Sequence, residues 1–128
     1  MHFFNTSKWL HGSLLYGAYS WLLLSGLLHL GIDVISQCIR GKRAPGPATT
    51  LYYGLNSSYA VSQILFAALA LFAIRHGVTA MGQSSGLVLG LLAAGAWFVL
   101  SLMFLEYSQP RMTVALFAAL LVGAALTA

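Results

Sequence analysis

Residues 87–105 read LVLGLLAAGAWFVLSLMFL, a stretch without a single charged side chain. A helix needs about 20 mostly apolar residues to cross a bilayer, and this stretch meets that requirement. The whole chain of 128 residues is 59% hydrophobic and only 6% charged, whereas a soluble domain carries about 25% charged residues. So much apolar surface excludes a soluble domain and a disordered chain alike. One cysteine excludes a disulfide scaffold, so the sequence predicts an integral membrane protein.

The charged residues divide the chain into four uncharged intervals. Each interval is long enough for one spanning helix, and none comfortably holds two. We expect spans over residues 9–36, 51–74, 87–105 and 112–126, within a single domain of residues 1–128. The predicted fold is all-α, an up-down bundle of four transmembrane helices. We expect the first span to be retained, because its apolar stretch is longer than that of a cleaved signal peptide.

The distribution of cations predicts the orientation of this bundle. Lys and Arg accumulate in the cytoplasmic loops of membrane proteins. The first and third loops hold four of these residues, whereas the N-terminus and the second loop hold two. We therefore expect loops one and three in the cytoplasm and both termini outside, in an inner membrane of bacterial type. Arg40, Lys42 and Arg43 serve mainly as this topology signal, and they are also candidates for contacting an anionic lipid head group.

Polar residues repeat along one face of each of the first two spans. Side chains three or four positions apart share a helix face. Such rows occupy the end of the first span and the start of the second: His29, Asp33 and Gln37, then Asn56, Tyr59 and Gln63. Counted from the basic first loop at about 1.5 Å per residue, the two rows lie at matching depths. We therefore expect a polar cleft between the first two helices.

The cleft has two interpretations. In the functional one it binds a small or lipid-like ligand, with His29 and Asp33 coupling a proton or cation and Glu106 with Arg111 acting as a gate or interface pair. In the structural one Asp33 pairs with Arg40 or Arg43, and the amides hydrogen-bond across helices as interhelical glue. The sequence leaves both open.

Small residues form a second pattern in the other half of the chain. They recur every four positions in the third span, at Gly82, Gly86, Gly90 and Ala94. Such rows let helix backbones approach closely. We expect packing within the chain, with a homodimer or a partner membrane protein as the alternative use of this row.

The sequence therefore supports three functions. The first is a ligand-binding membrane protein, with transport as one role of such a cleft. The second is an accessory or partner-binding subunit without a substrate, such as a complex subunit or an immunity-type protein. The third is a small membrane enzyme acting on a lipid-like substrate, which we favour least because the chain lacks nucleophile and phosphate-binding motifs. We expect no metal and no cofactor, since no second histidine lies near His29, and no nucleic-acid partner, since the cations form no basic stripe.

Overall fold

The computed structural model describes residues 2–128, with side chains from residue 5 onward. Helix α1 (His2–His29) continues through a π-helical segment, η1 (Leu30–Ser36), into the single turn α2 (Gln37–Ile39). It is followed by α3 (Pro47–Arg75), the short 3₁₀ helix η2 (Thr79–Gly82), α4 (Ser84–Phe104) and α5 (Gln109–Leu126). Within the described residues there are four helices long and apolar enough to cross a membrane, and no strand. The all-helical prediction is therefore confirmed.

The helices run from about half a turn to about three turns longer than the predicted spans. Their ends are set by backbone chemistry rather than by hydropathy. Pro47 stands at the first position of α3, and Pro110 lies in the first turn of α5. Proline needs no hydrogen-bond partner for its nitrogen at that position and is pre-set for helical φ. At the other ends, Gly41 (φ 59°) and Gly77 (φ 78°) adopt the left-handed conformation that stops a helix.

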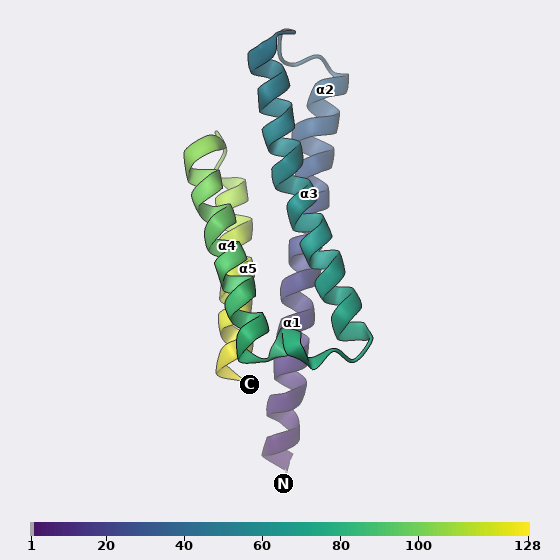
Figure 1. The fold of residues 1–128 in the computed structure, drawn as a ribbon, viewed down its shortest axis with the longest axis vertical. Helices are drawn as coiled ribbons and strands as arrows, with labels where there is room; N and C mark the ends of the chain where they lie inside the picture. The colour runs from purple at the N-terminus through teal and green to yellow at the C-terminus, as the bar shows by residue number, and fades with distance from the viewer. Residues whose placement is uncertain (1) are drawn as a thin grey trace.

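The helices alternate in direction, so that both termini lie at one end of the bundle and the first and third loops at the other (Figure 1). Helix α1 packs against both α3 and α5, and α4 packs against α5. Large side chains fill the centre where these helices meet. Tyr19 of α1 is fully buried, with its ring centroid 5.4 Å from that of Phe117 on α5 and 5.9 Å from that of Phe66 on α3. Trp97 of α4 reaches across to α3 and donates to the Ser62 hydroxyl at 3.0 Å.

The row of small residues on α4 packs inside the chain. Gly86, Gly90 and Ala94 are all buried. A Cβ atom on Gly90 would lie 2.7 Å from Leu121 Cδ1 and 2.9 Å from the Tyr19 hydroxyl, so a larger residue would have to displace the ends of these two side chains. These positions pack within the chain, Gly86 against η2 and Gly90 against α1 and α5.

The two helical hairpins differ in length. At about 1.5 Å per residue, α3 is about 44 Å long, whereas α4 and α5 are about 31 Å and 27 Å. Along the long axis of the bundle, the first loop therefore lies beyond the third loop, which joins α4 and α5 (Figure 1). As a result, the last turns of the α1–α2 helix have α3 as a neighbour but extend past the beginning of α5.

Candidate functional site

The candidate site begins where α1 changes its winding. Residues Leu30–Ser36 form a π-helix, a rare conformation that is found frequently at functional sites. His29 is the last residue before it and Asp33 lies in its first turn. His29 Nδ1 is 2.8 Å from Asp33 Oδ2, and the two side chains are 8% and 25% exposed. The segment thus holds a buried imidazole against a carboxylate that remains accessible.

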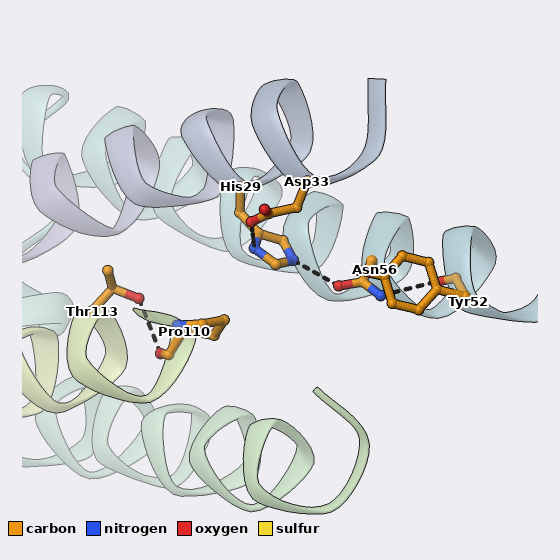
Figure 2. Close-up of polar contacts among 6 residues, drawn as sticks. All are labelled: His29, Asp33, Tyr52, Asn56, Pro110 and Thr113. Carbon is orange, nitrogen blue, oxygen red and sulfur yellow. Dashed lines mark hydrogen bonds and ion pairs between the residues drawn. The ribbon is translucent and has the colours of Figure 1, made fainter. Parts of the chain in front are cut away.

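Helix α3 supplies the other side of the imidazole. His29 Nε2 lies 3.1 Å from Asn56 Oδ1, and the Asn56 amide nitrogen donates to the Tyr52 carbonyl at 2.9 Å (Figure 2). The ring of Tyr59 meets His29 edge-on, with centroids 5.4 Å apart. The two polar rows therefore meet across α1 and α3, with His29 opposite Asn56 and Tyr59.

The polar rows border a cavity of about 270 Å³, but this cavity is not the cleft between α1 and α3 that the sequence suggested. Helix α5 forms its third wall, and Figure 2 shows Pro110 and Thr113 across from the His29–Asp33 pair. Gln37 and Asn56 do not line it. The lining residues come from three helices: Trp21, Leu24, Ser25, Leu28, His29, Ile32, Asp33, Tyr59, Gln63, Gln109, Pro110 and Thr113.

The sequence does not predict the contribution of α5 to this site. The predicted fourth span begins at residue 112, which leaves Gln109 and Pro110 before it and Thr113 at its start. A signal was present in the Ser108-Gln109-Pro110 break, which places polar groups at a helix start. Only the packing of α5 on α1, held by the Trp21 indole donating to the Thr113 carbonyl at 2.9 Å, brings these groups to His29.

The cavity combines a polar interior with an apolar rim. His29 and Gln63 are buried at its inner wall. Leu24 and Leu28 of α1 and Ile32 of η1 are each at least half exposed and form the outward side of the cavity. The site is therefore open at the outer surface of the bundle, where its rim is hydrophobic.

Glu106 forms its ion pair with Arg43 rather than with Arg111. The Arg43 guanidinium donates to Glu106 Oε2 at 3.0 Å and lies 3.4 Å above the centroid of the Tyr52 ring. Desolvation lowers the pKa of Arg43, but the contacts with Tyr52 and Glu106 outweigh it and raise the pKa above its ordinary value. Arg111 donates instead to the Leu105 carbonyl at 3.5 Å. The expected gate pair is thus replaced by a clasp between the first and third loops, outside the cavity.

The remaining candidates lie apart from the cavity. Arg40 and Lys42 are exposed in the first loop, next to Arg43. Among the residues that the structure describes, no group of three or more His, Cys, Asp or Glu side chains is placed to hold a metal ion.

No protein-family model, curated protein or solved structure matches this chain. The function is therefore argued from the site alone.

Proposed function

We propose that this chain is a small polytopic membrane protein that binds an amphipathic ligand in the cavity between α1, α3 and α5. The observation that supports this proposal is the combination of a buried polar wall with an exposed apolar rim. Binding sites of this kind are concave and mostly apolar, with a few placed polar groups that orient the ligand. A lipid-like molecule would place its head at His29 and Asp33 and its chain along Leu24 and Leu28, where α1 faces the bilayer.

The proposed position in the membrane follows from helix length. Helices α4 and α5 match the roughly 30 Å hydrocarbon layer of a bilayer, whereas α1 and α3 extend beyond it at the end that carries the first loop. His29 and Asp33 lie across from the start of α5 (Figure 2), and so at the proposed membrane boundary. This depth suits a ligand with a polar head and an apolar chain.

The proposed orientation places the first and third loops in the cytoplasm. Cys38 is the only cysteine and is exposed in α2, next to the first loop, so its labelling reports which side of the membrane this loop occupies. In intact bacterial cells or spheroplasts, a membrane-impermeant maleimide should leave Cys38 unlabelled until the membrane is opened. Equal labelling before and after permeabilisation would reverse the orientation.

The binding proposal is tested by filling the cavity. Thr113→Leu adds an apolar side chain to its wall, whereas Thr127→Leu makes the same change at the end of α5, away from the cavity. After purification in one mild detergent, the molecules retained by each variant are extracted and identified by mass spectrometry. We expect wild type and Thr127→Leu to retain an amphiphile that Thr113→Leu loses. Identical extracts from all three proteins would overturn the proposal and favour an accessory subunit without a ligand.

A further inference from the structure

Apart from His29, the cavity lining contains no side chain that could carry a positive charge. Asp33 is the only acid among the lining residues, and neither Lys nor Arg is among them. Two aromatic side chains, Trp21 and Tyr59, complete the polar end. A carboxylate beside aromatic rings attracts cations, including quaternary ammonium groups, which favour the faces of such rings. An anionic head group would find no fixed positive charge in this cavity.

The hydrogen bonds around His29 determine how many protons the His29–Asp33 pair holds. The Tyr52 carbonyl can only accept, so the Asn56 side chain must turn its NH₂ group toward it and its oxygen toward His29. His29 thus has an oxygen acceptor at Nε2 and a carboxyl oxygen at Nδ1. Both contacts are hydrogen bonds only if His29 and Asp33 together hold two protons. The pair is then an imidazolium with a carboxylate, or an imidazole with a carboxylic acid, and its net charge is zero in either form.

We propose that the ligand of this cavity is an amphipathic cation, and that its binding displaces one proton from the His29–Asp33 pair. This inference rests on the proposed function and adds the chemical class of the ligand. The pair without that proton carries one negative charge, so proton and cation compete for the same charge. The displaced proton leaves for water, His29 remains as a neutral imidazole donating to Asn56, and the cation takes the position beside Asp33.

Few other ionisable groups face the pair. From α3, Tyr59 touches His29, and its phenol stays neutral in the pH range used below. From α5, the residues at the cavity are Gln109, Pro110 and Thr113, which do not titrate. Arg111 follows Pro110 but donates to the Leu105 carbonyl. The proton count at the cavity is therefore set by His29 and Asp33.

The experiment uses the full chain in neutral detergent and dodecyltrimethylammonium as the probe. Isothermal titration calorimetry in two buffers of different ionisation enthalpy gives the number of protons released on binding. We expect release of up to one proton, and an affinity that rises with pH by up to about tenfold per pH unit when measured between about pH 5 and 8. Thr113→Leu should abolish this binding and Thr127→Leu should preserve it.

Three variants separate the two charges. Asp33→Asn should weaken binding by about tenfold or more, because it removes the negative charge. His29→Gln should keep binding but lose both the proton release and the pH dependence. Glu106→Gln removes the other acid, which lies outside the cavity, and should behave as wild type.

The two proposals can fail separately. Suppose that wild type retains an amphiphile that Thr113→Leu loses, but that the cationic probe binds Asp33→Asn as tightly as wild type. The proposal that the ligand is a cation is then refuted, and the proposal that the cavity binds an amphiphile stands. If the probe binds through Asp33 with no proton released at any pH, the displacement is refuted. If Thr113→Leu changes neither the retained molecules nor the binding of the probe, both proposals fall.

Discussion

Replacing Asn56 with alanine tests whether the His29–Asn56 hydrogen bond joins α1 to α3. Asn56 is 1% exposed, and its oxygen is the acceptor for His29 Nε2 at 3.1 Å. Its amide nitrogen donates to the Tyr52 carbonyl on its own helix, so that contact links no two helices. The Asn56→Ala variant therefore loses one interhelical bond and leaves a nitrogen of a buried imidazole without its partner.

The magnitude follows from this geometry. An unpartnered buried donor costs about 1–3 kcal/mol, whereas interhelical hydrogen bonds in membrane proteins average about 0.6 kcal/mol and reach about 1.7 kcal/mol in double-mutant cycles. We expect Asn56→Ala to lower the free energy of unfolding by about 1–3 kcal/mol. Because His29→Ala removes the same bond, the coupling energy between the two substitutions should be about 0.6–1.7 kcal/mol.

The assay is reversible unfolding in mixed micelles, measured for wild type, both single variants and the double variant. Ser58→Ala is the control, since its hydroxyl donates to the Gly54 carbonyl of the same helix and is exposed. We expect this change to stay within about 0.5 kcal/mol, as for surface substitutions generally. If Asn56→Ala costs no more than Ser58→Ala, or if the coupling energy is zero, the bond does not hold the helices together.

Two further predictions concern packing and the loop clasp. Gly86→Ala should destabilise the bundle by about 1–3 kcal/mol, because its Cβ would overlap the backbone carbonyl of Ala80. Gly95→Ala, on the open side of the same helix, should be neutral or stabilising. Thermal unfolding compares the two variants, and a Gly86→Ala protein as stable as Gly95→Ala would contradict the packing. Arg43→Gln should change the free energy of unfolding by less than about 1 kcal/mol, since its partner Glu106 is 60% exposed. This change should become smaller as the salt concentration rises. A larger loss of stability that does not depend on salt would show that the ion pair between the two loops stabilises the fold.

The sequence predicted the elements of this site better than their arrangement. Spacing by three and four placed His29 and Asp33 on one helix face and Asn56 and Tyr59 on another, and the structure brings these faces together. Spacing could not indicate that α5 closes the cavity, because nothing in one sequence relates Thr113 to Trp21 ninety-two positions earlier. The sequence also does not indicate that Glu106 pairs with Arg43 of the first loop rather than with Arg111, because the two loops are brought together only by the folded bundle.

The four apolar helices, and the polar groups toward one end of the first two, follow from the order of the residues alone. That information is local, since helix formation and hydrophobicity depend on composition and on neighbours within a few turns. The position of the cavity, the acid that borders it and the cation that pairs with Glu106 depend instead on how the helices pack. Helix packing depends on the fit between residues far apart in the sequence, such as Trp21 and Thr113, whose hydrogen bond sets α5 against α1 beside His29. Because α4 and α5 are shorter than α3, their hairpin then ends short of the first loop.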